Sequence, residues 1–301
     1  MEQFIRQLLN GLTVGSGYAL VALGYTMVYG VLKLINFAHG DLFMLGSYLA
    51  MTTTAVLLAH GLHAPGLVVL LAFLVSMGLV GLAGVGLEKA AYRPLRRAPR
   101  LAPVVSALGA AVVIQNAVML SYGAQYQVFP EGLVPSISWN VAGMTFPLLR
   151  LAILLLSVVL MAVMYLFIQR TTVGAAIRAV SLDHDTARLM GIDVDRVIML
   201  VFLIGPALGA AAGVMIGLYY RQVHFTMGWV YGLKAFTAAI LGGIGNIPGA
   251  MVGGIILGLF ETMAAGYVSS AWKDAFAFLL LIGILVLRPT GLLGERVAEK
   301  V

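Results

Sequence analysis

The sequence predicts an all-α protein, a polytopic bundle of membrane-spanning helices. Hydrophobic residues make up 61% of the 301 positions, and charged residues only 10%. Apolar runs repeatedly reach the roughly 20 residues that a helix needs to cross a hydrocarbon core about 30 Å thick. The alternation of polar and apolar residues that is typical of a membrane β-barrel is missing. We therefore expect one transmembrane domain over residues 1–301.

Eight apolar runs are long enough to be spans, so the bundle should have about eight helices. In order they are 12–32, 42–59, 67–87, 104–122, 151–168, 197–219, 251–268 and 276–287. A ninth run, 233–244, is short and glycine-rich, and it either crosses thinly or is re-entrant. The first run lacks the pattern of a cleavable signal peptide, so we expect it to be kept as a span. The absence of cysteine excludes disulfides and thiolate metal sites.

Basic residues predict which loops face the cytoplasm, because Lys and Arg collect on that side. If the loops around Lys33, 89–100, 170–196 and 288–300 are inside, thirteen of the eighteen basic residues are inside with them. The five left outside are Arg6, Arg150, Arg221, Lys234 and Lys273. This bias predicts that 170–196 and the C-terminus are cytoplasmic, whereas 123–148 and the N-terminus are external.

The longest polar interruption, residues 169–196, holds four of the basic and four of the twelve acidic residues. Ser181, Asp183 and Asp185 are good N-cap residues, and Gly191 is a natural C-terminal stop. We expect a short helix of two to three turns that ends near Met190. One edge, formed by Ala187, Leu189 or Met190, and Ile192, is apolar enough to enter a groove on a partner. An ordinary solvated loop is the alternative.

Glycines mark the places where helices approach closely or break. Gly205, Gly209, Gly213 and Gly217 recur every fourth residue, which favours close helix packing and subunit contacts. Two segments, 36–41 and 241–249, interrupt the apolar pattern. Non-helical backbone at membrane depth persists only where it is buried in protein or lines a wet cavity. Both breaks are therefore candidates for a polar pathway through the bundle.

Polar residues within the spans complete the set of pathway candidates. An ionised Glu261 at mid-membrane costs about 2.5–3.5 kcal/mol even on the lenient insertion scale, so it should face the interior with a partner. His39 and Asp41 are alternatively hydrogen-bonding groups that hold a bent helix, and Gln115 and Asn116 alternatively cross-link helices. The pathway candidates are Asn36, His39, Gly40, Asp41, Gln115, Asn116, Gly242, Gly243, Asn246 and Glu261.

Several chemistries lack support in the sequence. No Gly-Lys dipeptide is present, so the chain has no Walker A loop and energy must come from a partner. HExxH is also absent, and the cluster of Asp183, His184 and Asp185 has no metal geometry, so no metal site is expected. An enzyme is therefore not expected. An ion-coupled secondary transporter of small polar solutes is the alternative, since broken helices line the pathway there too.

Four motifs carry a resemblance to a known family. They are GYTMVYGVLKLINFAHGDLFMLGSY (24–48), AVSLDHDTARLMGIDVDR (179–196), AAILGGIGNIPGAMVGG (238–254) and LRPTGLLG (287–294). Together they resemble the branched-chain amino acid ABC-importer permeases. The resemblance implies that 170–196 is a cytoplasmic segment coupling the permease to ATPase subunits. The residues it assigns to ATPase coupling are Ala179, Asp183, Asp185, Ala187, Arg188, Leu189, Met190 and Gly191.

The resemblance also implies the rest of the assembly. The partners would be a similar, non-identical second permease, two cytoplasmic ATPase subunits and an extracytoplasmic substrate-binding protein. ATP would be used by the ATPase subunits, with no cofactor bound by this chain and no nucleic acid involved. The chain would be a multi-pass protein of the cell inner membrane and contact its lipid bilayer. Importers of urea, amides and aromatic amino acids share these motifs, so the exact substrate stays open.

Overall fold

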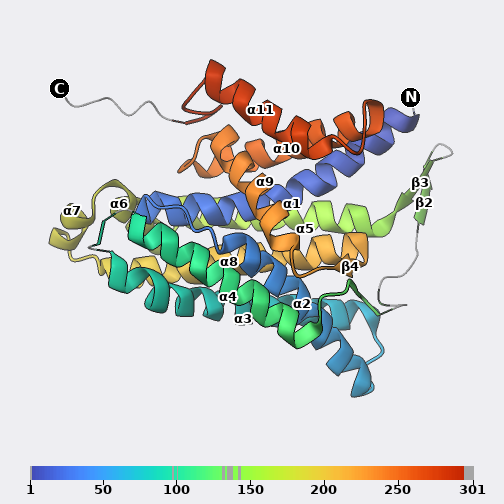
Figure 1. Ribbon diagram of the computed structural model, residues 1–301, viewed down its shortest axis with the longest axis horizontal. Helices are drawn as coiled ribbons and strands as arrows, with labels where there is room; N and C mark the ends of the chain where they lie inside the picture. Colours follow the sequence, from blue (N-terminus) through green and yellow to red (C-terminus); the bar gives the residue numbers. More distant parts are fainter. Residues whose placement is uncertain are drawn as a thin grey trace.

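The computed structural model describes residues 2–96, 98–99, 101–130, 133, 138–141 and 144–294 as a bundle of helices (Figure 1). Four of the basic residues counted above, Arg97, Arg100, Arg296 and Lys300, lie outside the described residues. The helices are α1 (Glu2–Leu32), α2 (His39–Ala59), α3 (Pro65–Leu87), α4 (Leu101–Tyr122), α5 (Leu148–Arg170), α6 (Thr172–Leu182), α7 (His184–Leu189), α8 (Val194–Tyr220), α9 (Met227–Gly242), α10 (Ile247–Tyr267) and α11 (Lys273–Leu287). A π-helical turn (Glu88–Tyr92) and a 3₁₀ turn (Arg93–Leu95) continue α3.

Short strands gather at one end of the bundle, on the right in Figure 1. There β1 (Gln127–Val128) pairs antiparallel with β4 (Gln222–Val223), and Gln127 lies opposite Val223. A hairpin of β2 (Ser138–Val141) and β3 (Met144–Pro147) precedes α5. Helices α6 and α7 lie at the opposite end. The two ends are therefore built differently, as expected for a protein with two unlike membrane faces.

The predicted membrane-spanning bundle is confirmed. Within the described residues, seven helices are long and apolar enough to cross a membrane, and each of them overlaps one of the first seven predicted runs. The eighth run is α11, which has 15 residues. The glycine-rich ninth run forms the C-terminal part of α9, which has 16 residues.

The glycine-rich run is helical, and α9 lies obliquely across the bundle (Figure 1). Helix α9 begins just after β4, whereas Gly245 and Asn246, in the turn that follows it, line the same pocket as Arg178 of α6. The backbone N–H groups of Leu292 and Leu293, which follow α11, donate to the carbonyl oxygens of Leu241 and Gly242 at 2.9 and 3.0 Å. The C-terminal segment and the turn after α9 therefore share one end of the bundle.

Two halves of the chain repeat the same arrangement in opposite directions. In α1–α4 and again in α8–α11, a long central helix is followed by a break and then by three more helices. Both breaks begin with a non-glycine residue of positive φ, Lys33 at 54° and Arg221 at 57°. The central helices α1 and α8 have equivalent neighbours in the two halves. Helix α1 packs on α10, the third helix of the other half, and α8 packs on α3, the third helix of the first half. In the same way, α9 packs on α1 and α2 packs on α8. Such an inverted repeat is common in transporters, and here α5–α7 join the two halves.

Close packing at the centre follows from small residues on α8. A Cβ atom at Gly213 would overlap the carbonyl oxygen of Phe43 on α2, and one at Gly205 would lie 3.4 Å from the carbonyl oxygen of Gly24 on α1. The hydroxyl of Ser47 donates to the carbonyl oxygen of Gly213 at 2.6 Å. Small side chains let the helix backbones touch. All of these contacts lie within this chain.

Candidate coupling segment and buried polar groups

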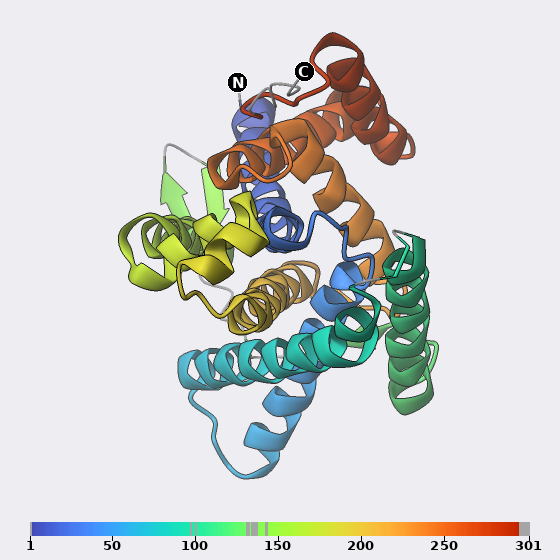
Figure 2. The ribbon, with the colours of Figure 1, turned by 90° about the vertical axis from the view of Figure 1, so that its left-hand side faces the viewer.

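Helices α6 and α7 form a separate projection that joins α5 to α8. The hydroxyl oxygen of Thr171 accepts a hydrogen bond from the N–H of Gly174 (2.9 Å) and so caps the start of α6. A Cβ atom at Gly174 would overlap the carbonyl oxygens of Phe167 and Ile168, so the turn from α5 into α6 needs glycine. Ile177 and Val180 are buried and attach α6 to the bundle. Viewed from this end in Figure 2, α5 and α4 lie on opposite sides of the bundle.

Helix α7 is held by caps at both ends. Oδ1 of Asp183 accepts hydrogen bonds from the N–H groups of Asp185 (2.8 Å) and Thr186 (2.9 Å). These bonds, first that of Thr186 and then that of Asp185, lower the pKa of Asp183 below its usual value. At the other end Gly191 has φ of +81°, and its N–H donates to the carbonyl oxygen of Arg188. The observed helix is shorter than the two to three turns expected, because α7 has only six residues.

The most exposed of the large apolar residues in this segment are Leu182, Leu189 and Met190, which are 87%, 88% and 78% exposed. This corrects the expected apolar edge. Ala187 is 3% exposed and Ile192 half-buried, because the capped turns direct both toward the bundle. Leu182 was not among the expected residues. Side chains this large and this exposed at the tip of a projection are suited to enter a groove on another protein.

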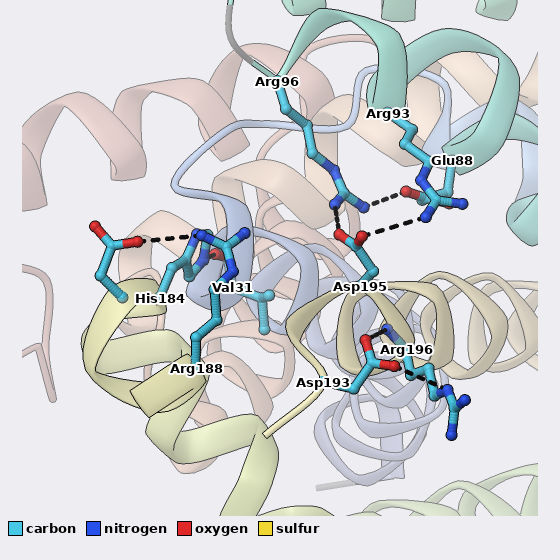
Figure 3. Close-up of polar contacts among 10 residues, drawn as sticks. Val31, Glu88, Arg93, Arg96, His184, Arg188, Asp193, Asp195 and Arg196 are labelled. Carbon is cyan, nitrogen blue, oxygen red and sulfur yellow. Dashed lines mark hydrogen bonds and ion pairs between the residues drawn. The ribbon is translucent and has the colours of Figure 1, made fainter. Parts of the chain in front are cut away.

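One hydrogen bond links the segment directly to the central helix α1. Nε2 of His184 donates to the carbonyl oxygen of Val31, 2.7 Å away (Figure 3). Val31 is in the last turn of α1, where a backbone carbonyl has no partner within the helix. Arg188 instead pairs with Asp185 on the exposed side of α7 (3.1 Å). The α7 end of the segment is thus bonded to the last turn of α1.

A second link connects the start of α8 with the extension of α3 (Figure 3). Asp195 pairs with Arg93 at 3.2 Å and also with Arg96, and Arg96 pairs in turn with the buried Glu88. Asp193 caps α8 by accepting from the N–H of Arg196 (3.1 Å). The start of α8, which follows α7, is therefore attached to the extension of α3.

Glu261 has the buried partner that the sequence predicted but did not name. Its carboxylate lies 2.6 Å from Nζ of Lys234 and accepts a hydrogen bond from the hydroxyl of Tyr18 (2.9 Å). Nζ of Lys234 also lies 2.6 Å from Asp274. Lys234, which the charge count placed on the outer side, is buried within the bundle, where its side chain is 4% exposed and pairs with both carboxylates.

The break after α1 and the first turn of α2 together hold four of the pathway candidates, because the break predicted over 36–41 ends at Ala38 and α2 begins at His39. Oδ1 of Asn36 accepts from the N–H of Ala38 (3.1 Å) and the hydroxyl of Tyr92 (3.0 Å). Gly40 packs so closely on α9 that a Cβ atom would overlap the carbonyl oxygen of Gly228. His39 and Asp41 are buried, and within the described residues both ring nitrogens of His39 and Oδ1 of Asp41 lack hydrogen-bond partners. Buried polar groups without partners are uncommon and call for a functional reason.

The other pathway candidates lie apart from this break. Gly242, Gly243 and Asn246 form the turn between α9 and α10, where Nδ2 of Asn246 donates to the carbonyl oxygen of Leu293 (2.8 Å). Gln115 is half-buried and Asn116 exposed on α4. Both α4 residues therefore lie on the surface of this chain. In the described part of the chain, no group of three or more His, Cys, Asp and Glu residues is suited to hold a metal ion.

Comparison with known proteins gives consistent results. The model of a family described as "Branched-chain amino acid transport system / permease component" matches residues 7–285. The high-affinity branched-chain amino acid transport system permease protein BraD of Pseudomonas aeruginosa is 44% identical over 99% of this chain and 98% of its own length. The LivH protein of Escherichia coli K12, with the same description, is 41% identical over the same shares. A probable branched-chain amino acid transport permease of Methanocaldococcus jannaschii is 29% identical over 96% of this chain and 92% of its own.

Proposed function

The chain belongs to the family of branched-chain amino acid transport permease components, and from this premise we propose that it forms half of the translocation pathway of an ABC importer. Its substrates are leucine, isoleucine and valine, or amino acids of similar size. The energy comes from two ATPase subunits bound at the end that carries α6 and α7. A second, similar permease completes the pathway in the inner membrane, and a soluble binding protein delivers substrate on the outside.

The observation that supports this mechanism best is the build of the α6–α7 projection. Its exposed tip carries Leu182, Leu189 and Met190, whereas its base is joined to α1 through His184 and to α8 through a turn of four residues, 190–193. An apolar tip fits a groove on an ATPase subunit, and the hydrogen-bonded base passes its displacement to the central helices. The segment 170–196 is therefore the cytoplasmic coupling segment of a single permease domain.

Substrate passes the broken helices rather than a closed binding site. Branched-chain amino acids are zwitterions with an apolar side chain, so they need brief polar contacts along a mainly apolar route. His39 and Asp41 offer such groups at the break after α1, where non-helical backbone also lies close. Asp41 lies against Gly228 of α9, and the His39 ring lies against Gly24 of α1 and Gly209 of α8, so both groups are covered by neighbouring helices. Motion of α1, driven through His184, uncovers these groups to substrate.

The second permease packs on the exposed face of α4, and the pathway is completed between the two subunits. Asn116 is exposed and Gln115 half-buried there, so neither contributes to a pathway contained within this chain. Facing a second permease, both side chains would line the space between the subunits. Polar side chains within a membrane normally face such a protein interior or a wet cavity.

Reconstitution with purified partners tests this function. Vesicles carrying the chain, a second permease and the ATPase subunits should take up radiolabelled leucine, isoleucine and valine only when ATP and a binding protein are supplied. Urea and acetamide serve as competitors to define the substrate class. Competition by urea at the same concentration as leucine would replace the amino-acid assignment with an amide importer.

A further inference from the structure

A polar hollow and an apolar groove lie next to each other beside the coupling segment, as in a lipid site. The hollow has a volume of about 320 Å³ and lies between α1, α5, α6 and the start of α10. Arg178, Gln169, Ser181 and Asn246 line it. The guanidinium of Arg178 donates to the carbonyl oxygen of Ile168, its only hydrogen bond within the described residues. The remaining N–H groups of Arg178 are available to a ligand.

An apolar groove continues from this hollow between α5 and α10. It has a volume of about 410 Å³ and is lined by Val158, Met161, Ala162, Tyr165, Met251, Val252, Ile255 and Ile256. Tyr165 lines both the hollow and the groove and so joins them. Along α5 the groove extends over residues 158–165, roughly 10 Å of helix. A ligand that fills both must have a polar or anionic head and an apolar tail.

We propose that this combined site binds an anionic phospholipid of the cytoplasmic leaflet. The phosphate pairs with Arg178 in the hollow, and one acyl chain lies in the groove between α5 and α10. Basic pockets between helices on the cytoplasmic side are suited to such headgroups, and guanidinium matches phosphate geometry. Since Arg178 is on α6, the bound lipid connects the coupling segment with α5 and α10. The proposal requires only that the chain resides in a membrane, so it does not depend on the transported substrate.

The position of the groove favours lipid over a protein occupant. Figure 2 shows α5 on the side of the bundle away from α4, where the second permease is placed above. Gly30 of α1 opens into the hollow, and a Cβ atom there would meet nothing within 4 Å. The space is therefore empty within this chain and can be filled without disturbing its packing.

Native mass spectrometry of the purified complex tests the proposal. The parent protein, released from phosphatidylglycerol-containing membranes, should retain phosphatidylglycerol in preference to phosphatidylcholine. Arg178→Gln should lower the retained fraction at least fivefold by removing the charge, and Gly30→Leu should lower it by filling the hollow. Arg170→Gln, which removes an exposed charge at the end of α5 outside the hollow, is the matched control and should retain lipid as the parent does.

A second pair of variants tests the groove. Ala162→Trp fills it, whereas Val163→Trp adds the same side chain to an exposed position of α5 outside it. Only Ala162→Trp should reduce lipid retention. Equal retention in all five site and control variants would overturn the proposal. Displacement of lipid by inorganic phosphate alone would also overturn it, because the hollow would then be a small-anion site and the groove would have no role. Crosslinking of groove residues to the second permease would overturn it as well.

Discussion

The buried Lys234 gives a prediction about the stability of the bundle, because its positive charge is paired with Glu261 and Asp274. Loss of one member of a buried ion pair leaves an uncompensated charge, which costs about 3–5 kcal/mol. We expect Lys234→Met to lower thermal stability in detergent strongly, because Glu261 and Asp274 then lose their cation. The double variant Lys234→Met/Glu261→Gln should recover part of the loss, since Gln can still accept from Tyr18. A double variant less stable than Lys234→Met would show that the pair is not coupled.

The cap of α7 gives a second prediction at residue scale. Asp183→Ala should increase hydrogen exchange at Asp185 and Thr186, whereas Asp183→Asn, which keeps an acceptor, should preserve their protection. The lowered pKa of Asp183 means that its charged form is favoured by folding. Its contribution is therefore complete above the usual pKa of aspartate and is lost only as pH falls through the lowered pKa. Unchanged exchange in Asp183→Ala would rule out a capping role.

At the scale of elements, the contact between α8 and α2 depends on small residues. Gly213→Ala should destabilise the protein, because the added methyl would overlap the carbonyl oxygen of Phe43. Gly209→Ala should be milder, since its Cβ would meet only the His39 ring at 3.4 Å. Gly86→Ala on α3, with nothing within 4 Å, should be neutral or stabilising by up to about 1 kcal/mol. Equal melting temperatures for Gly213→Ala and Gly86→Ala would contradict this packing.

Elements with a strong local signal were predicted well from sequence. The spans followed from apolar runs, and Gly191 ends its turn with the positive φ expected of a C-terminal glycine. Helix α6 was not predicted, although its buried residues Gly174, Ile177 and Val180 recur every third position; the polar interruption was interpreted as holding only one short helix. The Lys234–Glu261 pair was missed because its members lie on different helices, 27 residues apart. Local patterns carry no information about such tertiary partners.

The whole molecule is an inverted repeat that sequence reading did not detect. The breaks after α1 and α8 share the left-handed residues Lys33 and Arg221 and the same packing partners, yet little sequence. Packing geometry depends on where small and apolar residues fall, so different sequences satisfy it. The repeat places the start of α2 inside the bundle, where His39 is buried against Gly24 of α1 and Gly209 of α8.

Membrane orientation is tested by labelling, which is simple in a chain without cysteine. Thr226→Cys and Ser270→Cys, both exposed at the end opposite α7, should react with an impermeant maleimide in intact cells. Asp185→Cys, exposed on α7, should react only after the membrane is opened. The prediction follows from the excess of basic residues at the α6–α7 end. Labelling of Asp185→Cys in intact cells would place the coupling segment on the wrong side for an ATPase.

The central claim is that the apolar tip of the α6–α7 projection transmits ATPase movement to the bundle. The decisive measurement is substrate uptake, together with ATPase activity stimulated by the binding protein, in vesicles containing the complete complex. The variant Leu182→Asp/Leu189→Asp removes two side chains whose burial is worth about 1.5–3 kcal/mol each, so we expect at least a tenfold loss of both activities in a folded protein. Thr172→Asp, which adds a single aspartate at the exposed start of α6, should act like the parent. Parent-like uptake by the double variant, or uptake driven by a proton or sodium gradient without ATPase subunits, would contradict the claim.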